Sequence, residues 1–131
     1  MRALVIDDSR AMRRIVGTTL TDLGFEVREA GDGRQALDVL ADGGRQGWVP
    51  ELCCIDWNMP VMDGLQFVLA VRAVPAYRQV TLMMVTTESE TGQIVKALAA
   101  GAHEYLIKPF TADALRDKLA LLGLLPEGVS A

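Results

Sequence analysis

The sequence contains only two cysteines, Cys53 and Cys54, and they are adjacent. Successive side chains on a strand point to opposite faces, so these thiols are poorly placed to pair with each other or to share a metal ion. We interpret both as core thiols. Histidine is scarcer still. The one histidine, His103, follows Gly101 near a loop and lacks an obvious acidic or thiol neighbour for catalysis or metal binding. We interpret it as a surface residue that binds no metal and catalyses nothing.

Basic clusters and long apolar stretches are also missing. The net charge is −4 and the pI is near 4.9. No basic run or stripe is present, so nucleic acid is not an expected direct partner. The apolar stretch in MRALVIDDSR is too short, and meets carboxylates too soon, to be a signal peptide or a membrane span. We therefore expect a cytoplasmic protein with no membrane contact.

The remaining composition is that of one folded domain. The chain has 131 residues, of which 50% are hydrophobic and 23% are charged, a balance that can fill a buried core. No repeat of fixed period and no low-complexity segment is present. We expect one domain over residues 1–124, a short tail over 125–131 and no separate output domain.

Short apolar runs alternate with segments of helical periodicity. In the first such segment, Met12, Ile15, Val16, Leu20 and Leu23 recur at spacings of three and four, which makes one helical face. The alternation continues along the chain and predicts the following strands and helices: strands at 3–6, 25–30, 51–55, 81–85 and 104–107; helices at 9–23, 34–41, 64–74, 91–100 and 112–122; and a Gly-rich loop at 42–50. This pattern predicts an α/β fold, a doubly wound five-stranded parallel sheet with five helices.

Polar residues stand at the ends of four of the predicted strands. Asp7 and Asp8 end the first strand and Asp56 ends the third; Thr86 ends the fourth and Lys108 the fifth. In open parallel sheets, ligands bind beyond the carboxyl ends of the strands. A role in a turn explains one carboxylate, but not three carboxylates with a lysine and a hydroxyl at equivalent strand ends. We therefore expect these side chains to converge at one edge of the sheet.

Three carboxylates at one place need a counter-charge. Two like charges about 4 Å apart repel by roughly 4 kcal/mol at an effective dielectric of 20, and one lysine leaves a formal charge of −2. Oxygen ligands suit a hard cation, and we expect Mg²⁺ on Asp7, Asp8 and Asp56 in preference to Ca²⁺ or Zn²⁺. Together these groups predict phosphoryl transfer, with Asp56 as the nucleophile that becomes an aspartyl phosphate, Lys108 paired with the phosphoryl group and Thr86 donating a hydrogen bond to it.

Four strings in this order, IDDSR, CIDWNMPVMDG, MVTTE and YLIKPF, resemble the receiver domain of bacterial response regulators over essentially the whole chain. DWNMP and the expected lack of an output domain are most similar to the stand-alone regulators of chemotaxis. The resemblance implies a flavodoxin-like sheet with strand order 2-1-3-4-5 and a cis peptide before Pro109. It also implies that a histidine kinase phosphorylates Asp56 and that the backbone carbonyl of Asn58 completes the metal site.

The resemblance also implies a set of partners. These are a CheA-like histidine kinase, a downstream target such as the flagellar motor switch, and a phosphatase, all acting on a monomer. We expect no turnover of an external substrate, only catalysis by the protein of its own phosphorylation and dephosphorylation. Asn58 and Glu88 match positions that influence access of water to the phosphoryl group, so we expect a short-lived phosphorylated state. The alternative within the family is a phosphorelay intermediate that passes the phosphoryl group from Asp56 to a histidine phosphotransfer protein.

Signalling would depend on a conformational switch. If Thr86 moves toward the phosphoryl group, it vacates space that the aromatic ring of Tyr105 can enter, as in the family's rotamer switch. The alternative is a Tyr105 at the edge of the sheet with its hydroxyl in water. The resemblance places partner contacts at Ser89, Thr91, Ile94, Leu98, Tyr105, Ile107 and Lys118. The spacing of Ile94 and Leu98 is equally typical of plain core residues.

Several residues also have simpler interpretations. Asp63 and Thr111 are predicted to cap helices, and Asp8 or Ser9 could cap the first helix. Trp57, beside Asp56, is expected to be partly exposed. Two other functions remain open at this point: an aspartyl phosphatase of the dehalogenase-like family, whose DxD motif would follow the first strand, and a flavodoxin-like FMN binder, which shares the predicted fold.

Overall fold

The computed structural model describes residues 1–87 and 92–126. Its strands form one parallel sheet in the order β2-β1-β3-β4-β5. The strands are β1 (Arg2–Ile6), β2 (Glu26–Ala30), β3 (Leu52–Asp56), β4 (Thr81–Thr87) and β5 (Glu104–Lys108), and the helices are α1 (Arg10–Asp22), α2 (Gly33–Arg45), α3 (Gly64–Arg72), α4 (Ile94–Ala100) and α5 (Ala112–Leu121), with a short 3-10 helix η1 (Pro75–Tyr77). The predicted fold class and the implied strand order are confirmed.

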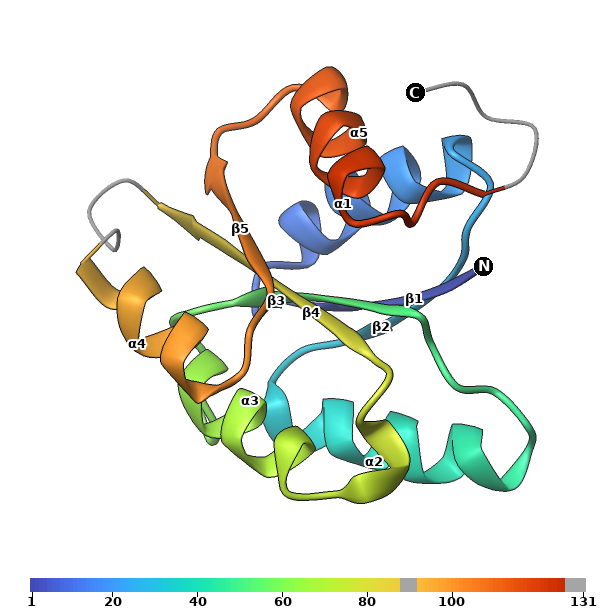
Figure 1. The fold of residues 1–131 in the computed structure, drawn as a ribbon, viewed down its shortest axis with the longest axis vertical. Helices are drawn as coiled ribbons and strands as arrows, with labels where there is room; N and C mark the ends of the chain where they lie inside the picture. The colour runs from blue at the N-terminus through green and yellow to red at the C-terminus, as the bar shows by residue number, and fades with distance from the viewer. Residues whose placement is uncertain (88–91, 127–131) are drawn as a thin grey trace.

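The sheet lies between two layers of helices, with α1 and α5 on one face and α2, α3 and α4 on the other (Figure 1). Alternating residues of the buried strands feed two separate cores. In β3, Cys53 and Ile55 face the layer of α2, α3 and α4, whereas Leu52 and Cys54 face α1 and α5. This is why β3 is an unbroken apolar run, and why both cysteines are buried free thiols as predicted.

Side chains at the helix starts fix where the helices begin. Ser9, Asp63 and Thr111 each accept a hydrogen bond from a backbone N–H of the first turn, at the start of α1, α3 and α5. Asp63 forms a reciprocal capping box with Gln66. The predicted caps are therefore confirmed, with Ser9 and not Asp8 in that role. The peptide between Lys108 and Pro109 is cis, as the resemblance implied.

Helix α2 is longer than predicted. It continues to Arg45, through the first residues of the segment expected to be a Gly-rich loop. Position 43 requires a glycine because Trp48 packs closely against it. The Trp48 N–H donates to the Gly43 carbonyl at 2.7 Å, and a Cβ on Gly43 would lie 2.6 Å from the Trp48 carbonyl oxygen. The glycine was therefore misread as a turn signal. The start predicted for α4 at position 91 lies outside the described residues.

The described part of the predicted tail, Leu125 and Pro126, lies against the domain. Leu125 packs on the core beneath α1 and α5, and a Cβ on Gly24 would lie 3.3 Å from the Cβ of Pro126. Within residues 1–87 and 92–126, no helix has the length and apolar character needed to cross a bilayer.

Candidate functional site

The acidic residues predicted at the strand ends do come together. Lys108, the last residue of β5, donates hydrogen bonds to Oδ2 of Asp7 at 2.9 Å and to Oδ1 of Asp56 at 3.2 Å. Carboxylate oxygens of Asp7, Asp8 and Asp56 lie within 4.8 Å of one another. Asp7 and Asp56 are buried, with 3% and 7% of their surface exposed, whereas Asp8 is exposed. The ammonium group of Lys108 thus links the carboxyl ends of three strands, β1, β3 and β5.

Crowding of these charges changes the protonation of Asp56. Burial, and then the negative charge of Asp7, raise the pKa of Asp56 to about 7, although Lys108 acts in the opposite direction. Burial alone would lower the pKa of Lys108, but its hydrogen bonds and ion pairs with Asp7 and Asp56 outweigh burial and raise it. Lys108 therefore stays charged, yet one positive charge does not fully compensate the carboxylates. This donor set of oxygens from three acids fits a hard divalent cation.

The acids line an open cleft at this edge of the sheet. Its volume is about 360 Å³, and it is lined by Asp7, Asp8, Ser9, Met12, Asp56, Asn58, Thr87 and Lys108. The sequence analysis missed Ser9, Met12 and Thr87 as lining residues. Ser9 follows the acidic pair directly and Met12 lies one helical turn further on, so both could have been found from the position of α1.

The loop after β3 holds Asp56 through backbone contacts. The N–H of Gly64 donates to the Trp57 carbonyl at 2.9 Å, and a Cβ on Gly64 would lie 2.6 Å from the carbonyl oxygen of Asp56. Only glycine allows this approach of α3 to the end of β3. Trp57 is 8% exposed and packs in the core beneath α2, α3 and α4. The expectation that Trp57 is partly exposed is therefore wrong, because its ring turns inward after the strand ends.

Thr86 occupies a different place from the one expected. It is fully buried, and its Oγ1 has no hydrogen-bond partner among the described residues. The cleft is lined instead by Thr87, which pairs with Lys108 across β4 and β5. Strand β4 runs two residues further than predicted, so Thr86 lies within the strand and not at its end. The structure thus brings Asp7, Asp8, Asp56, Asn58 and Lys108 to the cleft, but not Thr86.

The predicted output face is only partly assembled on the surface. Tyr105 is half-buried and packs against the core beneath α4, while Nζ of Lys118 lies 4.5 Å from the centre of its ring. Lys118 also donates to Oε1 of Glu104 at 3.0 Å. Ile94 is 7% exposed, so its interpretation as a core residue holds, whereas Leu98 is 40% exposed. Ile107 is half-buried; Glu88, Ser89 and Thr91 lie outside the described residues.

His103 is exposed, as predicted, but it has a specific role at the opposite end of the sheet. Its Nδ1 accepts a hydrogen bond from the backbone N–H of Leu82 at 3.1 Å and lies 3.3 Å from a guanidinium nitrogen of Arg72. Arg72 also donates to the carbonyl oxygens of Val80, Gly101 and Tyr77. These contacts link α3 to the start of β4 and β5, and they could not be predicted because they join positions that are distant in the chain.

Comparison with known proteins agrees with this geometry. Residues 3–120 match the response regulator receiver domain. The chain is 43% identical over 120 residues to the chemotaxis protein CheY homolog of Campylobacter jejuni, which covers 91% of this chain and 89% of that protein. It is 41% identical over 126 residues to the chemotaxis protein CheY1 of Helicobacter pylori, covering 93% and 96%.

A solved structure gives the same result. The chemotaxis response regulator CheY4 of Vibrio cholerae superposes with a TM-score of 0.80 and 37% sequence identity, over 92% of this chain and 97% of that one. The matched region contains β1 apart from Arg2, all of β2 to β5 and every residue that lines the acidic cleft. The chain therefore belongs to the family of response regulator receiver domains.

Proposed function

We propose that this chain is a chemotaxis response regulator that a histidine kinase phosphorylates on Asp56 in the presence of Mg²⁺. The observation that carries the proposal is the hydrogen bonding of Lys108 to both Asp7 and Asp56 at the edge of an acidic cleft. The two relatives described above are named as chemotaxis proteins, which favours this role over that of a phosphorelay intermediate. The kinase is CheA-like, and the downstream target is a protein such as the flagellar motor switch.

Asp56 is the nucleophile of the proposed reaction. Its carboxylate attacks phosphorus, a new O–P bond forms, and the P–N bond to the kinase histidine breaks, with the imidazole leaving and taking up a proton. This requires the deprotonated carboxylate, and a pKa of about 7 places a large fraction of Asp56 in the protonated form near neutral pH. A positively charged group that favours the ionised carboxylate of Asp56 is therefore part of the mechanism.

Asp7, Asp8, Asp56 and the backbone carbonyl of Asn58 would hold Mg²⁺, which when bound neutralises charge on the carboxylates and on the transferred phosphoryl oxygens. Lys108 supplies a point charge beside the Oδ1 of Asp56 and pairs with the phosphoryl group after transfer. Lys108 thereby lowers the energy of the transition state of phosphoryl transfer, a reaction whose catalysis consists mainly of positioning and charge neutralisation.

Signalling would pass from Asp56 through Thr86 to Tyr105. The buried hydroxyl of Thr86 has no partner among the described residues, and the phosphoryl group would supply an acceptor for it. Tyr105 pairs with Met84 across β4 and β5, two positions before the pair of Thr86 with Ile107 and so on the same face of the sheet. A shift of Thr86 would therefore alter the packing around Tyr105 and the face that Tyr105, Lys118 and Leu98 present to a partner.

Hydrolysis of the aspartyl phosphate by the protein itself completes the proposed cycle. Asn58 lines the cleft and can influence how water approaches the phosphoryl group. No turnover of an external phosphate ester is expected, which distinguishes this function from that of an aspartyl phosphatase.

The test is intact mass after incubation with acetyl phosphate and Mg²⁺, at short times, with and without EDTA. We expect one phosphoryl group on the wild type and on Asp63→Asn, and none on Asp56→Asn or in the presence of EDTA. Asp63 is a matched control because it is an acid in the same loop whose role is to cap α3, and Asn caps equally well. Phosphorylation of Asp56→Asn, or wild-type phosphorylation that is indifferent to EDTA, would contradict the proposal.

A further inference from the structure

Arg13 joins the end of β1 to β2 from its position on α1. One guanidinium nitrogen donates to the backbone carbonyl oxygen of Asp7 at 2.6 Å, and Nε donates to Oε1 of Glu29 at 3.2 Å. The Arg13 side chain is only 19% exposed. The planar guanidinium can serve both acceptors at once, which a single ammonium group cannot do in the same geometry. Arg13 is thus a fixed part of the wall behind the acidic cleft.

The carbonyl that Arg13 holds belongs to the peptide between Asp7 and Asp8. The other polar atoms of Asp7 are also held: its N–H donates to the Ala30 carbonyl at 3.2 Å, Oδ1 accepts from the Ser9 N–H at 2.9 Å, and Oδ2 accepts from Lys108. Asp8, in contrast, is exposed. The direction in which its side chain leaves the backbone depends on the plane of the peptide that precedes it. Arg13 fixes that plane.

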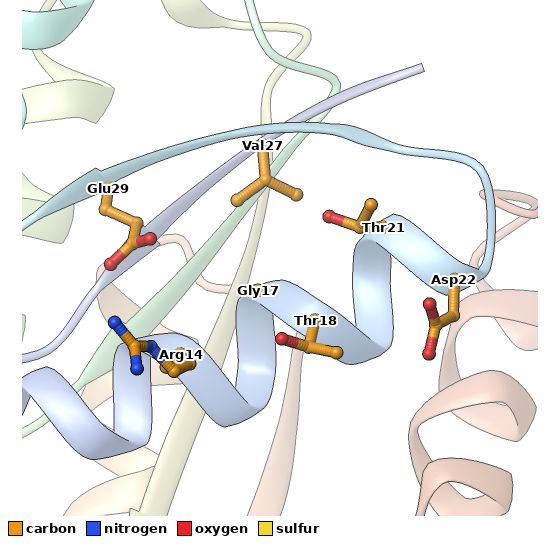
Figure 2. Close-up of a pocket in the computed structure, with 7 residues that line it drawn as sticks. All are labelled: Arg14, Gly17, Thr18, Thr21, Asp22, Val27 and Glu29. Carbon is orange, nitrogen blue, oxygen red and sulfur yellow. The ribbon is translucent and has the colours of Figure 1, made fainter.

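Glu29 orients Arg13 from the far side. It lies on β2, whose residue Ala30 pairs with Ile6 at the end of β1. Figure 2 shows the Glu29 carboxylate at one end of a groove between α1 and β2, with the guanidinium of Arg14 on the same side of the groove. Arg14 is exposed and lines this groove, whereas it does not line the acidic cleft. The two neighbouring arginines therefore face different surroundings.

We propose that Arg13 is a positioning residue of the divalent cation site, which holds the Asp7–Asp8 peptide so that both carboxylates can converge on one cation with Asp56. The inference rests on the proposed function, because it takes the acidic cleft to be a Mg²⁺ site. Arg13 itself contacts neither a phosphoryl group nor the cation. It acts through the backbone, as residues behind a metal site orient the ligands in front of them.

The sign of the effect separates positioning from simple charge. A guanidinium near the cleft repels a divalent cation, so a role through charge alone predicts that removing Arg13 tightens Mg²⁺ binding. A role through positioning predicts the opposite, because the freed peptide lets Asp8 adopt directions that do not favour the cation. Replacing Arg14 removes the same charge from the same helix without releasing the Asp7 carbonyl, and it is therefore the matched control.

The experiment measures the Mg²⁺ dissociation constant by isothermal titration calorimetry for the wild type, Arg13→Gln, Arg13→Lys, Arg14→Gln and Glu29→Gln. We expect Arg13→Gln to weaken binding on the order of tenfold, and Glu29→Gln to weaken it less. Arg13→Lys should recover part of the loss, since lysine can still donate to the Asp7 carbonyl. Arg14→Gln should stay within about twofold of the wild type, because an exposed charge is screened by salt.

Equal or tighter Mg²⁺ binding by folded Arg13→Gln would overturn the proposal, as would an equal loss in Arg14→Gln. If thermal melting shows that Arg13→Gln does not fold, Glu29→Gln decides: wild-type affinity in that variant overturns the proposal and a weakened affinity supports it. If the wild type binds no Mg²⁺, the proposed function is overturned together with this inference. Wild-type binding that the variants leave unchanged overturns the inference alone.

Discussion

Nζ of Lys108 lies 3.2 Å from Oδ1 of Asp56, in a hydrogen bond that joins the last residue of β5 to the last residue of β3. The side chains of both residues are largely buried, with 13% and 9% exposed, although both line the acidic cleft. Even so, the pKa of Asp56 is raised to about 7, mainly by burial and then by Asp7. Lys108 reduces the repulsion among the carboxylates in the cleft but does not remove it.

The raised pKa of Asp56 predicts how the stability of the protein depends on pH. The folded protein holds a proton on Asp56 that the unfolded chain has released between about pH 4 and pH 7, so stability should fall as pH rises through that window. Asp56→Asn should remove this contribution to the pH dependence and raise stability by on the order of 2 kcal/mol at pH 7.5. Urea unfolding in EDTA at pH 5 and pH 7.5 measures both effects, with Asp63→Asn as control. A stability change between pH 5 and pH 7.5 that is the same in the wild type and in Asp56→Asn would argue against a raised pKa of Asp56.

Gly64 and Gly44 form a matched pair of glycines at which alanine has opposite effects. A Cβ on Gly64 would lie 2.6 Å from the Asp56 carbonyl and 2.9 Å from the Met84 side chain, whereas one on Gly44 meets nothing within 4 Å. Gly64→Ala should therefore cost about 2 kcal/mol or more and slow phosphorylation, because the end of β3 must shift. Gly44→Ala, inside α2, should stabilise by up to about 1 kcal/mol.

Urea unfolding and the rate of labelling by acetyl phosphate measure the two glycine variants. An alanine at position 64 that leaves both quantities unchanged would show that α3 can move away from Asp56 without cost. A destabilising alanine at position 44 would contradict the open space beside that helix.

Much of the site could be predicted because strand ends are visible in the sequence. Asp7, Asp56 and Lys108 each follow or end a short apolar run, and the rule that ligands meet at the carboxyl edge of a parallel sheet brought them together. The position of Thr86 could not be predicted as well. The apolar run ends at Val85 but β4 continues to Thr87, and an apolar pattern does not fix the residue at which a strand ends.

Contacts between positions that are distant in the chain could not be predicted from the sequence. The bond from Arg13 to the Asp7 carbonyl and its pairing with Glu29 depend on how α1 lies against β2, which periodicity does not report. Gly43 was assigned to a loop because glycine favours turns, but a glycine needed for close approach to Trp48 looks the same in the sequence. Burial of Trp57 was missed for a similar reason, since the direction of a side chain after a strand end depends on the loop.

The buried hydroxyl of Thr86 predicts a gain in stability at the expense of signalling. An unpaired buried hydroxyl costs free energy that an apolar group of similar shape avoids, so Thr86→Val should stabilise by about 1 kcal/mol. The same variant should still be labelled by acetyl phosphate. It should lose the phosphorylation-dependent change around Tyr105, and the binding of the partner protein is the measurement of that loss. Thr87→Val, at the exposed end of the strand, should bring no such gain. A destabilised Thr86→Val would indicate that the hydroxyl has a partner in solution.

His103 predicts a second, opposite dependence of stability on pH. Burial, and then the charge of Arg72, lower the pKa of His103 from 6.5, and protonation of Nδ1 would break its hydrogen bond from the Leu82 N–H. Because the folded protein resists a proton that the unfolded chain takes up, stability should fall as pH drops below about 6.5. In the background of Asp56→Asn, which removes the opposing trend, urea unfolding between pH 5 and pH 7.5 should show this loss. Adding His103→Gln should abolish it, and a slope that survives His103→Gln would assign the titration to another group.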